Sequence, residues 1–354
     1  MPAVQPPCKV LVSGANGYIA IWVVRTLLEK GYSVRGTVRS EEKAAHLRQL
    51  FKSYGDMHEV VIVEDITKEG AFDEAVKGVD AIEHTASPFH MNADDPNELI
   101  NPAVNGTVGI LKSALKNGHS VKRVVVTSSG AAILRDSPTP STFSELDWNE
   151  QCLEIVKEKG REAPNMMKYR ASKTLAEKAA WDFWNEHKAD VGWDLSVLNP
   201  PYVFGPAIHA LTGPSSLNTS ASLFYNTVAL PNSNGATNEF LASTGTCWID
   251  VRDLADAHVL SLENEAAGGE RIIVSAGLWK WQDFIDAANA ISPPPKLTTG
   301  GLPKGNPCAG TGHPSTVHLL YYDTAKAARI LGLKYRTIAE TTKDTLADYE
   351  AKWW

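Results

Sequence analysis

Two periods of hydrophobic and polar positions alternate along the first half of the chain. Short apolar runs rich in β-branched residues, such as CKVLVSG, YSVRGTV and VKRVVVTSS, have the pattern of buried strands. Between them lie segments with apolar residues at helical spacing, such as YIAIWVVRTLLEKG, GAFDEAVKG and AVNGTVGILKSALKNG. Strands that alternate with helices predict an α/β fold built on a doubly wound parallel sheet.

The pattern becomes irregular beyond Gly205, where Ser, Asn, Thr and Pro are frequent in residues 207–243 and 292–316. Regular segments return in TCWIDVRDLADAHVLSLEN, ERIIVSAG and WKWQDFIDAANAI. These changes predict a larger first domain and a smaller second domain. The motifs described below indicate cofactor binding for the first and substrate binding for the second. The first consists of residues 7–201, with 243–277 partly returning to it, and the second of residues 202–242 and 278–354.

Composition and charge limit the classes of partner. Of the 354 residues, 43% are hydrophobic and 21% are charged, and the net charge of -7 disfavours nucleic acid and anionic membranes. The four cysteines lie far apart without a CxxC pair, so neither a metal site nor a disulfide scaffold is expected. The start MPAVQPPCKV lacks a signal-peptide pattern, and no apolar run reaches the roughly 18 residues of a membrane span. A cytoplasmic protein without a membrane partner is therefore expected, and its oligomeric state stays open.

A glycine-rich turn is the first candidate for chemistry. In SGANGYIA, Gly14, Gly17 and Ala20 stand between a predicted strand and a predicted helix. Glycine there lets the backbone approach a pyrophosphate, which the amides and dipole of the following helix stabilise. This placement on the first strand-to-helix turn favours dinucleotide binding by a Rossmann-type domain over a purely structural turn.

The end of the next predicted strand indicates which dinucleotide binds. A protein selective for NAD places an acidic residue there for the ribose 2′-hydroxyl, whereas VRGTVRSEEK offers Arg39 backed by Lys43. A cationic fork suits a 2′-phosphate, so the expected cofactor is NADP(H). The alternative is that both side chains are surface charges paired with Glu41 and Glu42.

Hydroxyl and ammonium groups follow in TSSG and YRASK. Ser128 and Ser129 end a predicted strand, at the edge where open α/β sheets bind ligands, and these residues alone leave open which serine acts. Tyr169 and Lys173 stand four residues apart on a predicted helix and therefore share one face. The Lys173 ammonium and an oxidised nicotinamide are expected to lower the pKa of Tyr169, which then gives a proton at neutral pH.

The chain resembles the extended short-chain dehydrogenase/reductases in motifs that span nearly its whole length: SGANGYIA, Arg39, EDI, HTASPF, NGT, VVVTSS, YRASK and NPPYVFGP. It is similar to their dihydroflavonol-reductase-like group. It is most similar to fungal NADPH-dependent methylglyoxal and 3-methylbutanal reductases, through LNTSASL, IDVRDLADAH, RIIVSAG and KAARILGLKYR. It lacks the NWYCYGK type of signature of cinnamoyl-CoA reductases. The resemblance implies a Rossmann-type enzyme that reduces small-molecule aldehydes and ketones to alcohols with NADPH.

The resemblance also implies roles for single residues. Tyr169 matches the proton donor, Lys173 its partner and Ser129 the anchor of the substrate carbonyl, while Asn105 matches a proton relay. The residues expected to contact the cofactor are Gly14, Asn16, Gly17, Tyr18, Ile19, Arg39, Lys43, Asp65, Ile66, Thr85, Ala86, Ser87, Thr127, Tyr169, Lys173, Pro200, Val203 and Ser220. The residues expected to line the substrate pocket are Phe89, Ser129, Gly130, Ala131 and Tyr202.

Two positions depart from the family pattern. Ser13 stands where Thr is frequent, a change without an expected consequence. Gly130 stands where similar fungal reductases can carry a bulky aromatic residue. A glycine there is expected to leave room in the pocket, so aryl or branched carbonyls should fit besides small ones.

Two other functions remain open from the sequence. A sugar-nucleotide epimerase or dehydratase on the same fold needs a cationic site for a nucleoside diphosphate, and the region after Gly205 is poor in Arg. A non-catalytic NADP-binding protein does not need Ser129, Tyr169 and Lys173 together, and all three are present.

Overall fold

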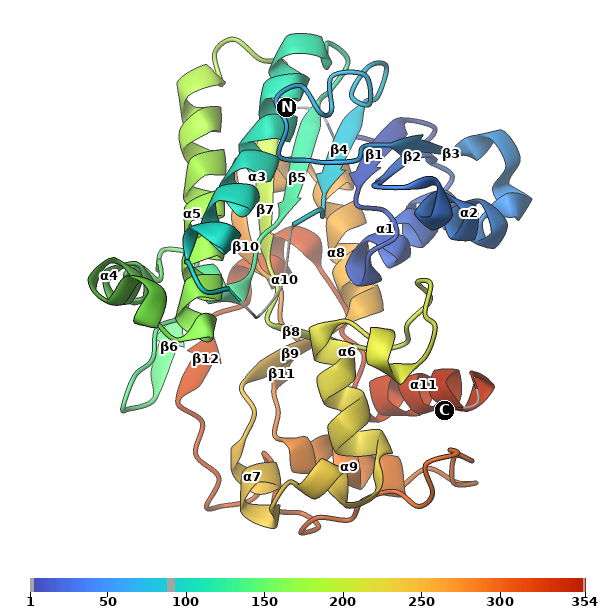
Figure 1. Cartoon of the computed structure of the whole chain (residues 1–354), viewed down its shortest axis with the longest axis vertical. Coiled ribbons are helices and arrows are strands. Elements are labelled where there is room, and N and C mark those ends of the chain that lie inside the picture. The colour runs from blue at the N-terminus through green and yellow to red at the C-terminus, as the bar shows by residue number, and fades with distance from the viewer. Residues whose placement is uncertain (1–2, 88–92, 353) are drawn as a thin grey trace.

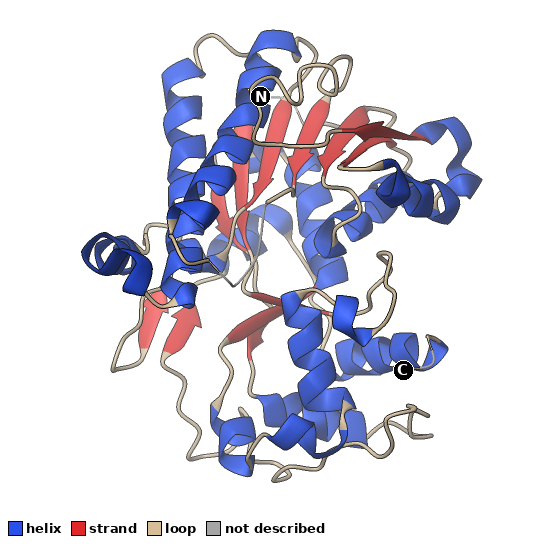
Figure 2. Ribbon diagram, in the orientation of Figure 1, coloured by secondary structure: helices blue, strands red, loops and turns tan. Residues whose placement is uncertain are grey.

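A parallel sheet of seven strands dominates the computed structural model, which describes residues 3–87, 93–352 and 354. The strand order is β10-β7-β5-β4-β1-β2-β3, and neighbouring strands run parallel (Figures 1 and 2). The strands are β1 (Lys9–Ser13), β2 (Ser33–Val38), β3 (His58–Ile62), β4 (Ala81–His84), β5 (Arg123–Thr127), β7 (Asp194–Asn199) and β10 (Arg271–Ile273). The expected doubly wound, Rossmann-type fold is confirmed.

Helices cover both faces of this sheet because successive strand residues point to opposite sides. In β5, Val125 packs in the core beneath α1 and α8, whereas Val124 and Val126 pack in the core beneath α3 and α5. The helices of the first face are α1 (Tyr18–Glu29), α2 (Glu41–Leu50) and α8 (Val251–Glu263), and those of the second are α3 (Asn97–Asn117) and α5 (Asn165–His187). Burial of strand residues on both faces explains why the strands read as continuous apolar runs.

A smaller unit lies below the carboxyl ends of the sheet strands (Figure 1). Its core is aromatic: the ring of Phe204 contacts those of Trp279 and Phe284, each with centroids 5.2 Å apart. Its strands form a sheet in the order β11-β9-β8. Its elements are β8 (Tyr202–Phe204), α6 (Thr219–Phe224), α7 (Asn238–Ser243), β9 (Cys247–Asp250), β11 (Gly277–Leu278), α9 (Trp281–Asn289) and α11 (Ile338–Ala351).

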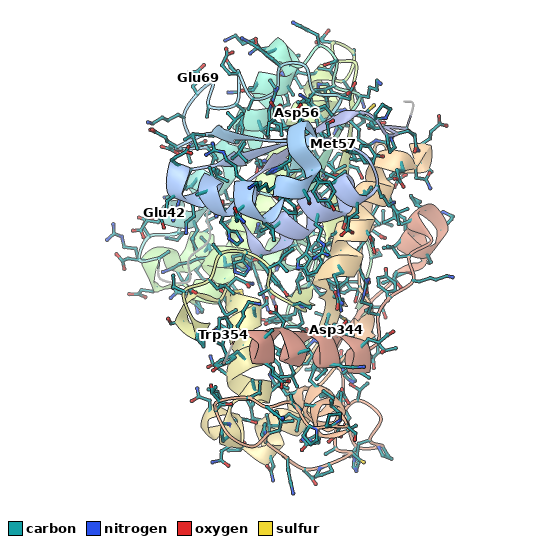
Figure 3. All side chains as sticks on the ribbon, turned by 90° about the vertical axis from the view of Figure 1, so that its right-hand side faces the viewer. Glu42, Asp56, Met57, Glu69, Asp344 and Trp354 are labelled. Atoms are coloured by element: carbon teal, nitrogen blue, oxygen red, sulfur yellow. The ribbon has the colours of Figure 1, made fainter. Side chains whose placement is uncertain are left out.

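Charged side chains join the two units. Arg252, near the start of α8, donates to Asp250 (2.8 Å) and to Asp344 of α11 (2.5 Å). Figure 3 shows Asp344 on the lower unit and Glu42 on α2 beside the sheet. This contact holds α11 against the helix layer of the larger unit.

The last segment of the chain partly returns to the larger unit. The strand β12 (Leu320–Tyr322) pairs in parallel with β6 (Ser141–Phe143), and α10 (Ala325–Leu331) buries Ala327 in the core beneath α1 and α8. The helix α4 (Glu150–Lys159) packs against α5 nearby. Residues 320–331 thus contact the larger unit, α8 covers one face of its sheet, and β10 forms an edge strand of that sheet.

One predicted helix is absent. The segment GAFDEAVKG forms turns between Gly70 and Gly78, whose φ values of 71° and 67° lie in the left-handed region. A stretch so short, interrupted by left-handed residues at both ends, does not nucleate a helix. Among the described residues, none of the helices combines the length and the apolar character needed to cross a bilayer.

Candidate active site

The glycine-rich turn between β1 and α1 has the backbone that a pyrophosphate site requires. Gly14 has a φ of 64°, and a Cβ atom placed on it would lie 3.0 Å from the Cβ of Ala86. Gly17 is the N-cap of α1 and offers no side chain to the first amides of the helix. The turn is thus shaped for close approach of an anion to the α1 N-terminus, and the residues fit a dinucleotide.

The residues around these glycines contribute in different ways. Asn16 and Ile19 flank the turn and the first residue of α1, Tyr18. The buried Tyr18 hydroxyl donates to the Gly205 carbonyl (2.9 Å), so its ring binds the smaller unit, and its backbone remains at the helix N-terminus.

Arg39 and Lys43 lie just beyond the carboxyl end of β2. Arg39 is exposed, and Ser40 caps the start of α2. Glu41 pairs with Arg48, and among the described residues neither Arg39 nor Lys43 forms an ion pair with a carboxylate. The alternative, in which Arg39 and Lys43 pair with Glu41 and Glu42, is therefore not supported by any ion pair among the described residues, and both cations are available for a phosphate.

The loops after β3 and β4 frame the same edge of the sheet. The Asp65 carboxylate accepts from the amide (2.9 Å) and the hydroxyl (2.6 Å) of Thr67, and these hydrogen bonds lower the pKa of Asp65. Ile66 packs against α3. The Ser13 hydroxyl accepts from the amides of Thr85 and Ala86, both at 3.1 Å, which fixes the loop through Ser87 beside Gly14. Serine at position 13 thus has a structural role of its own.

The structure separates the two serines that end β5. Ser128 is buried, and its hydroxyl donates to the Glu177 carboxylate. The Ser129 side chain hydrogen-bonds with Tyr169, and its Oγ accepts from the Ala131 amide (3.1 Å). Ser129, and not Ser128, therefore shares a site with Tyr169.

Burial controls the titration of the Tyr169 and Lys173 side chains. It raises the pKa of Tyr169, an effect that the hydrogen bond with Ser129 partly offsets. It lowers the pKa of Lys173 to about 8, although the charge of Glu177 acts in the opposite direction. The expected lowering of the Tyr169 pKa by Lys173 is therefore wrong for the chain by itself, because the cost of burying a phenolate dominates.

A cavity of about 490 Å³ opens beside these groups. Ser129, Gly130, Ala131, Tyr169 and Tyr202 line it, as does Ser220, which lies in its wall beside Thr219. Large apolar side chains stay unusually exposed at its surface, with relative exposures of 38% for Met166, 39% for Leu223 and 46% for Leu319. The cavity surface is thus largely apolar. Phe89, also expected in this pocket, lies outside the described residues.

The room expected at Gly130 is not free. A Cβ atom at this position would lie 2.3 Å from the hydroxyl oxygen of Tyr322 on β12, so the space is already filled. Sequence reasoning missed Tyr322, Leu319 and Leu320, because no motif links this segment to YRASK. Met166 and Arg170 could have been found, since they stand three residues before and one after Tyr169 on the same helix.

The remaining expected residues sit around the base of the site. The Pro200 carbonyl accepts from the Gly130 amide (2.8 Å), and Val203 is buried in β8. The Thr127 hydroxyl contacts Nε2 of the buried His258 (3.0 Å), whose Nδ1 contacts Glu83 (2.6 Å). These contacts fix the carboxyl end of β5 in place.

Two expectations concern places away from this cavity. Asn105 is exposed and lines a second hollow of about 350 Å³ with Thr67 and Lys112, so it does not meet Tyr169 in the cavity. Within residues 3–87, 93–352 and 354, no three His, Cys, Asp or Glu side chains gather in a group able to hold a metal ion.

Comparisons of the sequence and of the structure with known proteins show which family the chain belongs to. The sequence profile of the NAD dependent epimerase/dehydratase family matches residues 10–277. NADPH-dependent methylglyoxal reductase GRE2 of Saccharomyces cerevisiae is 37% identical over 346 residues, 95% of this chain and 96% of that protein. Ketoreductase azaE of Aspergillus niger is 34% identical over 349 residues, 96% of both chains. The crystal structure of Gre2 from Candida albicans in complex with NADPH has a TM-score of 0.83 at 34% identity, covering 97% of this chain and 98% of that chain. The expected resemblance is confirmed: the chain belongs to the NAD dependent epimerase/dehydratase family and is an oxidoreductase of the extended short-chain dehydrogenase/reductase type.

Proposed function

We propose that this enzyme reduces aldehydes and ketones to alcohols with NADPH, with Tyr169 as the proton donor and Ser129 as the anchor of the substrate carbonyl. One observation carries the proposal. The hydroxyls of Ser129 and Tyr169 are hydrogen-bonded partners at the wall of one apolar cavity, and Lys173 stands one helical turn from Tyr169. The names and the NADPH complex of the similar proteins support the same reaction class.

The two hydroxyls have the protonation that carbonyl reduction needs. NADPH, when bound, supplies the hydride that reaches the carbonyl carbon. Ser129 Oγ accepts from the Ala131 amide, so its own hydrogen, which hydrogen-bonds with Tyr169 in the structure, can turn to the carbonyl oxygen of a bound substrate. The raised pKa of Tyr169 keeps the phenol protonated at neutral pH, and Tyr169 donates this proton to the alkoxide oxygen as it forms.

Lys173 has the position to compensate the charge that remains. A phenolate is left on Tyr169 after the proton transfer, and a neighbouring ammonium stabilises it. With a pKa lowered to about 8, Lys173 is mostly protonated at neutral pH. Its place on α5 also suits hydrogen bonds to the ribose hydroxyls of the cofactor.

The other cofactor contacts follow the edge of the sheet. The pyrophosphate is assigned to the turn from Gly14 to Ile19, and the 2′-phosphate to Arg39 and Lys43. Asp65 and Ile66 flank the adenine, and the loop from Thr85 to Ser87, which follows β4, lies under the cofactor. Pro200 and Val203 form the turn on the nicotinamide side, Thr127 contacts the cofactor from the end of β5, and Ser220 meets a cofactor phosphate. This assignment makes residues 7–201, with α8 and β10, the cofactor domain.

The cavity favours an apolar carbonyl compound over a sugar nucleotide. A nucleoside diphosphate needs free cations, but each of the two arginines that line the cavity already has a carboxylate partner. Arg170 donates to Asp136 (2.8 Å), and Arg135 lies 3.5 Å from Asp147. Aryl, branched and alkyl carbonyls match the exposed apolar side chains at its surface.

The test is NADPH oxidation, followed by absorbance, with small aldehydes, α-dicarbonyls, aryl ketones and dihydroflavonols as substrates. Tyr169→Phe removes the proton donor, so turnover should fall by about 100- to 10,000-fold while NADPH binding, measured by fluorescence, persists. Tyr321→Phe, an exposed tyrosine on β12, is the matched control. Near-native turnover of Tyr169→Phe, or no oxidation with any carbonyl, would overturn the proposal.

A further inference from the structure

Gly130 and Tyr322 occupy one another's space although 192 positions separate them in the sequence. An ideal Cβ atom on Gly130 would lie 2.3 Å from the Tyr322 hydroxyl oxygen and 3.1 Å from the ring carbon that bears it. Both distances are shorter than van der Waals contact, so a side chain at position 130 and the ring at position 322 exclude one another. The Tyr322 hydroxyl also donates to the Gly130 carbonyl (3.2 Å).

Both partners are held in place by their surroundings. The strand β12 aligns Tyr322 with Phe143 of β6, and the Asp323 amide donates to the Phe143 carbonyl (2.8 Å). The Tyr322 ring packs against a core that includes Ile133 and Cys247. On the other side, the Gly130 amide donates to the Pro200 carbonyl (2.8 Å). The ring therefore has no easy way to move aside.

The Tyr322 ring is also part of the cavity wall. Tyr322 and Gly130 line the same cavity as Ser129 and Tyr169, and Gly130 directly follows Ser129. A substituent of a carbonyl held by Ser129 and Tyr169 would therefore lie in the cavity that this ring borders. The segment around β12, near the C-terminal end of the chain, thus contributes to the same cavity as Ser129 and Tyr169.

We propose that Tyr322 is a specificity-determining residue of the carbonyl pocket, and that position 130 is glycine because the Tyr322 ring takes the place of its side chain. The proposal rests on the proposed function for its substrate, and on geometry alone for the pairing. The ring limits the width of the substituent beside the carbonyl. The pocket of this enzyme thus receives its aromatic wall from the C-terminal part of the chain.

Substrate preference tests the wall. The kcat/KM values for methylglyoxal and for a phenyl ketone of the acetophenone type are measured with the wild type, Tyr322→Phe and Tyr322→Ala. Removal of the ring in Tyr322→Ala should move the kcat/KM ratio toward the phenyl ketone by about tenfold or more, whereas Tyr322→Phe keeps the ring and shifts it by less than about threefold. The exposed neighbour Tyr321→Ala should leave the ratio unchanged. A ratio that Tyr322→Ala does not move would overturn the role in specificity, because a merely structural residue lowers both rates together.

A double-mutant cycle tests the pairing. Gly130 is not among the described glycines with a positive φ, so alanine there brings no backbone strain and its cost comes from the ring. Gly130→Ala should lower the Tm by about 3 °C or more in the wild type and by clearly less in a Tyr322→Ala background, with Tyr322→Phe in between. Additive shifts would contradict the pairing.

The two experiments fail independently of the proposed function. The Tm cycle needs no substrate, so it reports on Gly130 and Tyr322 even in an enzyme that reduces no tested carbonyl. Conversely, the proposed reaction is upheld if the wild type reduces both substrates and Tyr169→Phe reduces neither. If Tyr322→Ala then leaves the kcat/KM ratio of the two substrates unchanged, only the role of Tyr322 in specificity is overturned.

Discussion

The Arg271 guanidinium donates to the Glu177 carboxylate in a buried ion pair, and Glu177 stands one helical turn from Lys173 on α5. Glu177 also accepts from the Ser128 hydroxyl and from the Asn199 amide (2.7 Å), and Asn199 donates in turn to the Ser129 carbonyl (3.2 Å). One carboxylate therefore ties α5 to the ends of β5, β7 and β10. It positions both halves of the candidate site, Ser129 on its strand and Lys173 on its helix.

Glu177→Gln should shift the pH dependence of the reaction. The Glu177 charge raises the pKa of Lys173, whereas burial lowers it to about 8. Without that charge the ammonium deprotonates at a lower pH, so the alkaline fall of kcat should begin earlier than in the wild type. The control is Glu150→Gln. Glu150 on α4 is the exposed partner of Lys178, which lies on α5 as Lys173 does, and its removal should keep the wild-type pH profile. An unchanged profile of Glu177→Gln would show that the charge does not reach Lys173.

Arg39→Ala should weaken NADPH binding far more than NADH binding. A lost charge-assisted contact to phosphate corresponds to about 1.5–3 kcal/mol, more than tenfold in Kd, and NADH has no 2′-phosphate to lose. Fluorescence titration with both dinucleotides measures the difference. Arg48→Ala on α2, whose guanidinium pairs with Glu41, is the control and should change neither affinity. Equal losses for both dinucleotides would place Arg39 away from the phosphate.

Sequence patterns were sufficient where the physics is local. The glycine-rich turn, the cations after β2 and the i,i+4 pair of Tyr169 and Lys173 all depend on neighbours within a few residues, and the structure shows the turn between β1 and α1, the cations after β2 and the pair on α5. Parallel strands also follow from local alternation, which is why the fold class could be predicted.

Contacts between distant segments could not be read in the same way. The choice between Ser128 and Ser129 depends on Glu177 and Tyr169, and the space at Gly130 depends on Tyr322. The pKa of Tyr169 depends on how deeply the folded chain buries the phenol. Each of these is decided by tertiary packing, for which a single sequence carries no periodic signal.

Asp194→Asn should destabilise the protein strongly. Asp194 accepts from Nε (2.6 Å) and Nη2 (2.8 Å) of Arg123, which is fully buried beneath the loop that follows α8. Removal of one buried charge leaves the other uncompensated, at a cost of about 3–5 kcal/mol in the free energy of unfolding. Glu29→Gln, in the exposed pair with Arg25, should change it by less than about 0.5 kcal/mol. Urea unfolding compares the two, and similar small losses would contradict the argument.

His84→Asn should make the protein less sensitive to acid. Burial and the facing Lys173 lower the pKa of His84 from 6.5 to about 3, so between these values the unfolded chain binds a proton that the folded protein does not. Stability from this group is therefore lost as the pH falls below 6.5, by about 2 kcal/mol at pH 5. Asparagine does not titrate, so the stability difference between pH 8 and pH 5 in urea unfolding should shrink by that amount. Asp253, whose pKa burial raises to about 6, acts in the opposite direction but is common to both proteins and cancels. The control His119→Asn, at an exposed histidine, should show the same pH dependence of stability as the wild type. If His84→Asn also shows the wild-type pH dependence, His84 becomes protonated inside the fold and the prediction is wrong.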